Sequence, residues 1–180
     1  MQLLDAAVDA IRARGPGVTM EQIARAGDVT KPILYRHFGD KGGLYAALAE
    51  RYTGVLLARL QAALEAGRDR RDRVSRTVEA YLAAIEREPQ VYRFLVHSDD
   101  PASSQVRSFV RRLSAQLAVG IGQELAVPAS RADAWGHGIV GMVQAAGDWW
   151  LEAGPADERL PREQLVQELT DLLFGAYGTS

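Results

Sequence analysis

Apolar residues recur at the three- and four-residue spacing of an amphipathic helix along most of the chain. Residues 3–13 follow this spacing up to a glycine-rich stretch, and the segment from Lys41 to Glu65 continues it without a proline. Two short helices are expected between them. Further helices are expected after the charged run 68–73 as far as Glu88, and over 89–96, 101–125, 130–153 and 161–177. The pattern predicts an all-α fold of about nine helices.

The first of the two short helices has clear start and stop signals. Thr19 can cap its amino end, and Gln22 three residues later completes a capping box. Gly27 and Asp28 end it, because both residue types tolerate positive φ better than most. The turn that follows is only about three residues long, as in a helix-turn-helix.

The second short helix divides into an inner and an outer face. Thr30 can cap it, and Pro32 is tolerated in its first turn, where a missing amide costs no intrahelical hydrogen bond. The residues expected to pack inward are Val29, Ile33, Leu34 and Phe38. Those expected to point outward are Lys31, Pro32, Tyr35, Arg36 and His37. Two cations, a phenol and an imidazole on one short face favour contact with phosphates and base edges of DNA.

The segment IARAGDVTKPILYRHFGDKGGLYAAL, residues 23–48, resembles the DNA-binding signature of the TetR (tetracycline-repressor) family of transcriptional regulators. The resemblance covers roughly residues 3 to 50. One position departs from the family pattern, which usually has Ala-Gly where this chain has Gly27-Asp28. The glycine therefore stands one residue early, and Asp28 is expected to take the left-handed conformation in its place.

The resemblance implies a regulator that binds a pseudo-palindromic operator in double-stranded DNA as a homodimer. It assigns phosphate contacts to Thr30, Tyr35 and His37, base or phosphate contacts to Lys31 and Arg36, a thymine methyl contact to Pro32, and flanking backbone contacts to Thr19 and Lys41. Because a single helix-turn-helix reads only a short half-site, a dimer fits this mode of recognition. We expect a repressor that responds to a small, hydrophobic effector.

Composition limits the alternatives. The chain has 180 residues, 47% of them hydrophobic, and a net charge of −2, so DNA affinity has to come from a local patch. Its two lysines, Lys31 and Lys41, both flank the second short helix. There is no cysteine, no signal peptide, and no apolar run near the length of about 18 residues that spans a bilayer. We expect a cytoplasmic protein without a membrane partner.

The helix expected over residues 130–153 is apolar on two faces, so two different surfaces have to cover it. The simplest second cover is another copy of the chain, through a four-helix interface with the last helix. The residues expected at this interface are Gly136, Val140, Val143, Gly147, Trp150, Leu165, Leu169, Leu172 and Leu173. The expected organisation is a DNA-binding domain, residues 1–46, and an effector-binding and dimerisation domain, residues 47–180, with the fourth helix spanning the boundary.

The second domain interleaves aromatic and polar side chains. TetR-like proteins hold an effector in a pocket among these helices, and the residues of this chain that could line one are Tyr81, Tyr92, Phe94, His97, Phe109, Trp135, His137, Met142, Asp148 and Trp149. For each of these residues taken alone, ordinary core is the more frequent role. Their apolar, aromatic character favours a hydrophobic effector such as an acyl chain, a steroid-like compound or an aromatic compound.

Two other classes of function compete with regulation through DNA. An effector-binding or interaction module of the same fold could lack specific operator binding, and the early glycine at position 27 favours it. An α-helical enzyme is the other alternative. His97 is followed by Ser98, Asp99 and Asp100, but neighbours at a helix end rarely converge as a catalytic triad does. No metal-ligand pair such as HExxH is present. We therefore expect no catalysis, no metal ion and no cofactor.

Overall fold

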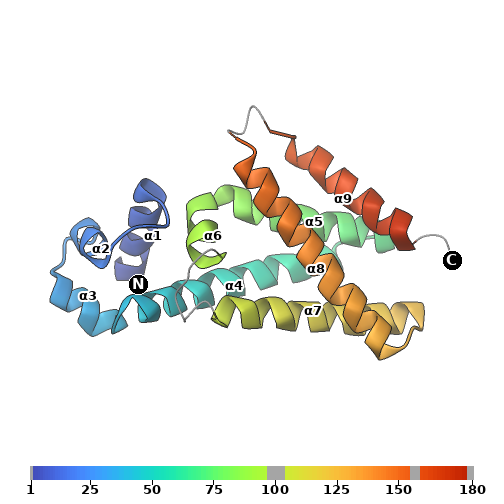
Figure 1. The fold of residues 1–180 in the computed structure, drawn as a ribbon, viewed down its shortest axis with the longest axis horizontal. Coiled ribbons are helices and arrows are strands. Elements are labelled where there is room, and N and C mark those ends of the chain that lie inside the picture. Colours follow the sequence, from blue (N-terminus) through green and yellow to red (C-terminus); the bar gives the residue numbers. More distant parts are fainter. Residues whose placement is uncertain (1, 97–103, 155–158, 178–180) are drawn as a thin grey trace. The chain divides into compact units, whose positions relative to one another are not determined.

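The computed structural model describes residues 2–96, 104–154 and 159–177, and these residues form nine helices and no strand (Figure 1). In chain order the helices are α1 Gln2–Arg14, α2 Met20–Ala26, α3 Lys31–Phe38, α4 Lys41–Glu65, α5 Arg70–Arg87, α6 Pro89–Val96, α7 Ser104–Leu125, α8 Ala129–Glu152 and α9 Arg162–Tyr177. The predicted all-α fold is confirmed. Helix α8 begins after Pro128 rather than at Ser130, and the predicted start of the seventh helix at Pro101 lies outside the described residues.

The chain forms two compact units. The first contains Met1–Val55 and Glu88–Ser108, and the second contains Leu56–Arg87 and Phe109–Ser180. Helix α6 therefore belongs to the same unit as α1 to α3, although the sequence placed everything after residue 46 in a separate domain. The functional boundary expected at residue 46 stays a prediction, while the packing divides α4 near its middle.

One hydrophobic core holds the first unit together. It is built from α1, α2, α3, the first half of α4, and α6, and α3 contributes a single fully buried side chain, Leu34. Helix α6 contributes Val91, Phe94 and Leu95 to this core. The short helices α2 and α3 are too small to bury enough surface by themselves, so their positions depend on the longer helices around them.

A buried tyrosine joins α4 to α6. Tyr45 is 1% exposed, and its hydroxyl donates a hydrogen bond to the backbone carbonyl of Leu95. Its ring also lies against Phe94, with the two ring centroids 5.8 Å apart. A buried hydroxyl without a partner would cost free energy, and the carbonyl at the end of α6 supplies that partner. Tyr45 thereby fixes α6 against the first half of α4.

A charged pair adds a second connection within the first unit. The Arg12 guanidinium of α1 forms an ion pair with Glu88, beside the start of α6, with Nε 2.8 Å from a carboxylate oxygen. Tyr52 of α4 lies in the same neighbourhood, and burial raises the pKa of its phenol, with the Glu88 charge acting in the same direction. Polar groups of α1, of α4 and of the residue before α6 therefore lie close together, in addition to the shared core.

The junction between α3 and α4 requires glycine. Gly39 has φ of +79°, and Asp40 accepts a hydrogen bond at 2.8 Å from the amide of Gly43. A β-carbon added to Gly43 would lie 1.8 Å from the carbonyl oxygen of Phe38, the last residue of α3. Because that obstacle is backbone, it cannot rotate away. The absence of a side chain at position 43 therefore sets how closely the end of α3 approaches α4.

In the second unit, α5 contacts both α8 and α9. Two glycines of α8 permit close approach within the same chain. A β-carbon on Gly136 would lie 2.5 Å from the carbonyl oxygen of Ser114 in α7, and one on Gly147 would lie 2.8 Å from Ile85 in α5. Both glycines are buried. The close helix contacts that these residues allow are therefore internal.

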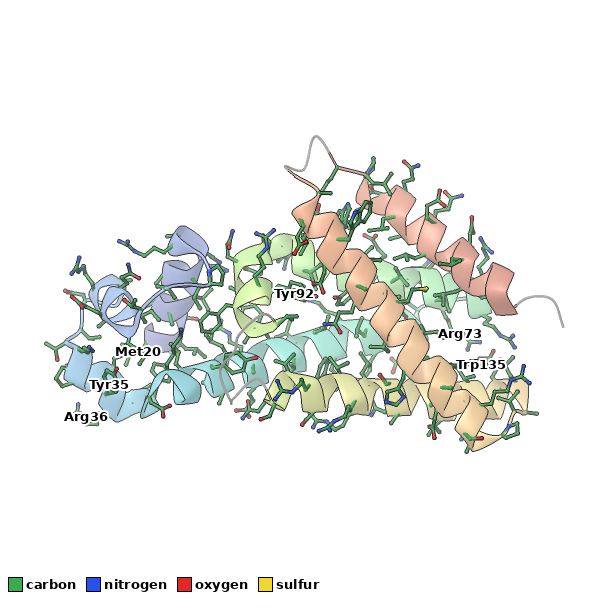
Figure 2. All side chains as sticks on the ribbon, viewed as in Figure 1. Met20, Tyr35, Arg36, Arg73, Tyr92 and Trp135 are labelled. Carbon is green, nitrogen blue, oxygen red and sulfur yellow. The ribbon has the colours of Figure 1, made fainter. Side chains whose placement is uncertain are left out.

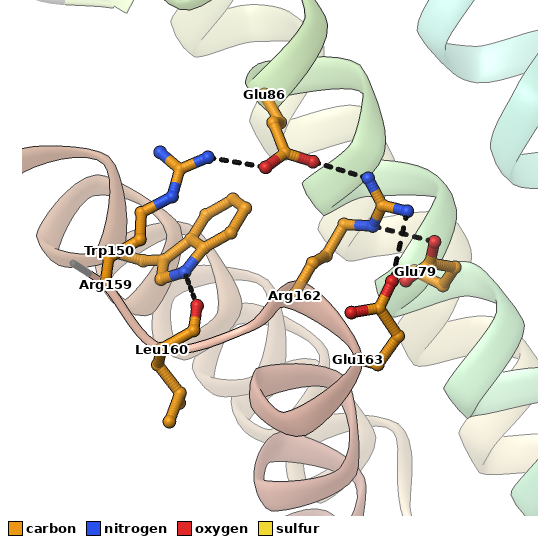
Figure 3. Close-up of polar contacts among 7 residues, drawn as sticks. All are labelled: Glu79, Glu86, Trp150, Arg159, Leu160, Arg162 and Glu163. Carbon is orange, nitrogen blue, oxygen red and sulfur yellow. Dashed lines mark hydrogen bonds and ion pairs between the residues drawn. The ribbon is translucent and has the colours of Figure 1, made fainter. Parts of the chain in front are cut away.

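Figure 3 shows a polar cluster that fixes the start of α9 against α5 and the end of α8. The Trp150 indole donates a hydrogen bond at 2.6 Å to the carbonyl of Leu160, and the Arg159 guanidinium stacks 3.9 Å from the indole centroid. Glu86 of α5 accepts ion pairs from both Arg159 and Arg162. Stacking and charge pairing act together here, and partial burial strengthens both.

Two of the three glycines of α4, Gly43 and Gly54, predict opposite effects of the same substitution. Gly43→Ala should destabilise the protein by roughly 1–3 kcal/mol, because the new methyl group collides with the α3 backbone. Gly54→Ala should stabilise it by up to about 1 kcal/mol, since position 54 is exposed with nothing within 4 Å of an added β-carbon. Urea unfolding followed by circular dichroism measures both. Equal midpoints for the two variants would contradict the proposed role of Gly43.

Candidate nucleic-acid interface

Helix α2 begins with the predicted capping box. The hydroxyl of Thr19 accepts a hydrogen bond from the Gln22 amide at 3.3 Å, and the Gln22 side chain accepts one from the Thr19 amide at 2.9 Å. These two bonds satisfy amides that the first turn of a helix leaves without partners. The start of the motif is therefore fixed by local chemistry that the sequence already contains.

The turn between α2 and α3 keeps its geometry although its glycine is early. Gly27 has an ordinary φ of −86°, whereas Asp28 takes the left-handed conformation with φ of +50°. Gly27 has a different reason to be glycine, because a β-carbon there would lie 3.3 Å from the β-carbon of Ala6 in α1. The expectation that Asp28 adopts positive φ is confirmed. Small size at position 27 allows α1 to approach the turn closely.

Helix α3 presents most of its surface to solvent. Thr30 stands at the N-cap position with extended backbone, but its side chain makes no capping hydrogen bond, contrary to the prediction. All eight residues expected at the DNA are exposed, namely Thr19, Thr30, Lys31, Pro32, Tyr35, Arg36, His37 and Lys41. Figure 2 shows Tyr35 and Arg36 on α3. The Lys31 ammonium lies 5.8 Å from the centroid of the Tyr35 ring, so these two exposed groups are neighbours on the helix.

One residue of α3 departs from the predicted division into faces. Ile33 was expected to pack inward with Val29, Leu34 and Phe38, but it is 37% exposed. Leu34 is fully buried, and Val29 and Phe38 pack against the core. Consecutive residues of a helix point about 100° apart, so a helix that directs residue 34 at the core turns residue 33 toward its flank.

The cations of this surface differ from others in the same unit. Arg12, Arg25 and Arg51 each form an ion pair with a carboxylate. Within the described ranges, neither Lys31 nor Arg36 forms such a pair. Lys41, at the first turn of α4, instead lies 6.0 Å from the ring centroid of Phe94. Cations without carboxylate partners are available to neutralise phosphates.

The residues expected to line an effector pocket fall into both compact units. Tyr92 and Phe94 are in the first unit, where Phe94 is part of the core, and His97 lies outside the described residues. The remaining candidates are in the second unit. Figure 2 labels Tyr92 on α6 and Trp135 on α8.

Within the second unit these candidates have different environments. Phe109 is buried and Tyr81 lies against Gly147, while Met142 and Asp148 are partly buried. Trp135 is also partly buried, and the Arg131 guanidinium lies 4.6 Å from its ring centroid. His137 and Trp149 are exposed, and Trp149 retains 58% of its surface. His137 and Trp149 therefore face solvent in the single chain and do not line an interior.

Most residues expected at a dimer interface are already covered within one chain. Those buried are Gly136, Gly147, Trp150, Leu165, Leu169 and Leu173. Val140 and Val143 are partly buried, and Leu172 is 56% exposed. The physical reason is that the buried residues lie on the faces of α8 and α9 that pack against α5 and α7. Of the nine expected residues, only Val140, Val143 and Leu172 have surface left for a second copy.

Among the described residues, no group of three or more histidine, cysteine, aspartate or glutamate side chains could hold a metal ion. In the same ranges, no helix is both long enough and apolar enough to span a bilayer.

Comparison with known proteins identifies the class of this chain. Residues 3–48 match the family described as bacterial regulatory proteins, tetR family, and residues 59–180 match the tetracyclin repressor-like C-terminal domain. An HTH-type transcriptional regulator of Mycobacterium tuberculosis is 31% identical, over 97% of this chain and 75% of the relative. The activator FasR of Mycolicibacterium smegmatis is also 31% identical, over 97% and 80%. The chain belongs to the TetR family and is a helix-turn-helix transcriptional regulator.

Solved structures share the whole fold. A TetR-like regulator from Rhodococcus has a TM-score of 0.76 at 22% identity, covering 99% of this chain and 95% of its own. FadR of Bacillus subtilis, in complex with stearoyl-CoA, has a TM-score of 0.72 at 16% identity, covering 96% of both chains. AibR, in complex with isovaleryl coenzyme A and operator DNA, has a TM-score of 0.71 at 17% identity, with the same coverage.

Proposed function

We propose that this regulator binds a pseudo-palindromic operator as a homodimer, acts as a repressor, and responds to a hydrophobic acyl thioester. The observation that carries the DNA-binding part is the outer face of α3. Its cations Lys31 and Arg36 form no ion pair within the described residues, and Tyr35 and His37 stand exposed beside them. Cations left without carboxylates beside hydrogen-bonding side chains suit the phosphate backbone and base edges of DNA.

The hydroxyls at the two helix starts suit phosphate contacts for different reasons. Thr30 makes no capping bond, so its hydroxyl can donate to a phosphate oxygen. The Thr19 hydroxyl oxygen accepts a hydrogen bond from the Gln22 amide, and the hydroxyl proton remains available for donation to a phosphate oxygen. Lys41 at the first turn of α4 completes the phosphate contacts on the flank. These roles follow the family motif position by position.

The effector part rests on two kinds of support. FadR of Bacillus subtilis and AibR, which share this fold, have been solved with stearoyl-CoA and isovaleryl coenzyme A. The second unit of this chain also contains partly buried aromatic and thioether side chains, among them Tyr81, Trp135 and Met142. An acyl chain needs apolar surroundings of this kind, and an acyl thioester would join it to a polar group.

The dimer part rests on the solvent face of α8. No aspartate, glutamate, lysine or arginine occurs between residues 134 and 147. The exposed positions there include Ala134, Gly138, Gly141 and Ala145, spaced on one face that ends at Trp149. Among the described residues, no atom lies within 4 Å of a β-carbon added to Gly138 or Gly141. Small residues beside an exposed tryptophan suit close packing of a second α8 about a two-fold axis.

Removing a cation from α3 tests the DNA-binding proposal. Lys31→Ala should weaken binding to the DNA upstream of the gene at least tenfold and reduce the salt dependence, because phosphate neutralisation is lost. Arg112→Ala, an exposed cation of α7, is the matched control and should leave binding unchanged. Fluorescence anisotropy at two salt concentrations, with scrambled DNA of equal length, measures both. Equal affinity of the wild type for the two DNAs would support a module without operator recognition.

Thermal unfolding tests the effector. Stearoyl-CoA at about one hundred times its dissociation constant should stabilise the protein by about 2.7 kcal/mol, which corresponds to roughly 5–10 °C. Coenzyme A alone should give little shift, since it lacks the acyl chain. Addition of the acyl thioester in the anisotropy assay then tests whether it releases the DNA, as expected of a repressor's inducer. Stabilisation by small polar ligands only would contradict a hydrophobic effector.

Glycine variants on opposite sides of α8 test the dimer. Gly141→Glu should shift sedimentation equilibrium from dimer to monomer, because it places charge on the proposed interface without touching the core. Gly136→Ala should instead lower the free energy of unfolding by roughly 1–3 kcal/mol through its collision with α7. A Gly141→Glu variant that remains as dimeric as the wild type would show that the interface lies elsewhere.

A further inference from the structure

Ile33 is a branched apolar residue that lies partly exposed on the outer side of α3. It is 37% exposed on a helix of eight residues whose contribution to the core is made by Leu34. The exposed part of this side chain, more than a third of its surface, gains nothing from burial in the first unit. The neighbouring exposed aromatic, Tyr35, is 39% exposed. The stability of the unit therefore accounts for only part of what isoleucine does at this position.

The position of Ile33 on α3 indicates what could cover it. It lies in the first turn, where its amide bonds to the carbonyl of Thr30 at 3.0 Å. Residues three and four positions later share its side of the helix, and these are Arg36 and His37, both exposed. Ile33 is therefore an apolar group on a face that carries a cation and an imidazole. Residues in the first turns of a recognition helix are the ones that approach base edges in the major groove.

The major groove of DNA offers one apolar group to such a side chain. Of the four bases, only thymine presents a methyl group there, at C5. We propose that Ile33 is a specificity-determining residue that selects a thymine in each half-site by packing against this methyl. The inference rests on the proposed binding of operator DNA. A protein partner would also cover Ile33, but the cations around it, Lys31 and Arg36, suit a polyanion better.

The expected effect is modest and specific to one base. Loss of one buried methyl corresponds to about a fourfold loss of affinity. Replacing thymine by uracil removes this methyl and leaves every hydrogen-bonding group of the base in place. The substitution therefore separates apolar readout from hydrogen bonding and from phosphate contacts.

The test begins with a duplex selected by the wild-type protein from a random DNA library. Each thymine of the selected site is then replaced by uracil in both half-sites, and anisotropy gives the ratio of dissociation constants for uracil and thymine. The wild type should show a ratio of about four or more at the thymine that Ile33 reads. In Ile33→Ala this ratio should fall to about one at that position only. Arg112→Ala, which removes an exposed cation of α7 outside the proposed interface, is the control and should leave all the uracil ratios unchanged.

The outcomes are distinguishable. Failure of the wild type to enrich any duplex would overturn the proposed DNA-binding function, and this inference with it. Selective binding with the same uracil ratios in wild type and Ile33→Ala would overturn only the role of Ile33. Urea unfolding provides the second measurement: the midpoint of Ile33→Ala should fall much less than that of Leu34→Ala, whose side chain is fully buried. A fall as large as that of Leu34→Ala would assign Ile33 to the core and overturn the inference.

Discussion

The close approach of α4 to the end of α3 is the constraint on which the candidate DNA surface depends. Helix α3 buries one side chain fully, so core packing alone determines its direction weakly. Its orientation is set at both ends by backbone geometry. Asp28 takes positive φ before it, and the carbonyl of Phe38 occupies the space where a β-carbon on Gly43 would lie. Small residues and turns therefore hold the helix that carries the proposed contacts.

Helix α6 connects this surface to the rest of the first unit. The Tyr45 hydroxyl bonds to the carbonyl of Leu95, and Phe94 lies near both Tyr45 and Lys41. Lys41 is also one of the proposed phosphate contacts. Any displacement of α6 would therefore alter the surroundings of a group at the candidate interface. This physical connection lies inside one compact unit and runs through side chains of its core.

The glycines of α8 separate the interior of the chain from its proposed interface. Atoms of α7 and α5 fill the space where β-carbons on Gly136 and Gly147 would lie, whereas described atoms leave that space open at Gly138 and Gly141. In the sequence, all four glycines look alike, as small residues on an apolar helix. Only the packing of α5 and α7 decides which of them remain available to a second copy. The proposed interface therefore lies on the face of α8 that includes Gly138 and Gly141.

The sequence by itself determined the helices, their caps and the motif. Periodic apolar residues located all nine helices among the described residues to within a few positions, because hydrophobic spacing and capping are local. The eight candidate DNA contacts are exposed as expected, since all but Pro32 have polar or charged side chains that are costly to bury without partners. Tertiary structure decided the rest. It exposed Ile33, turned Gly136 and Gly147 inward and placed α6 with the first unit, because which apolar face is covered depends on distant helices that no local pattern specifies.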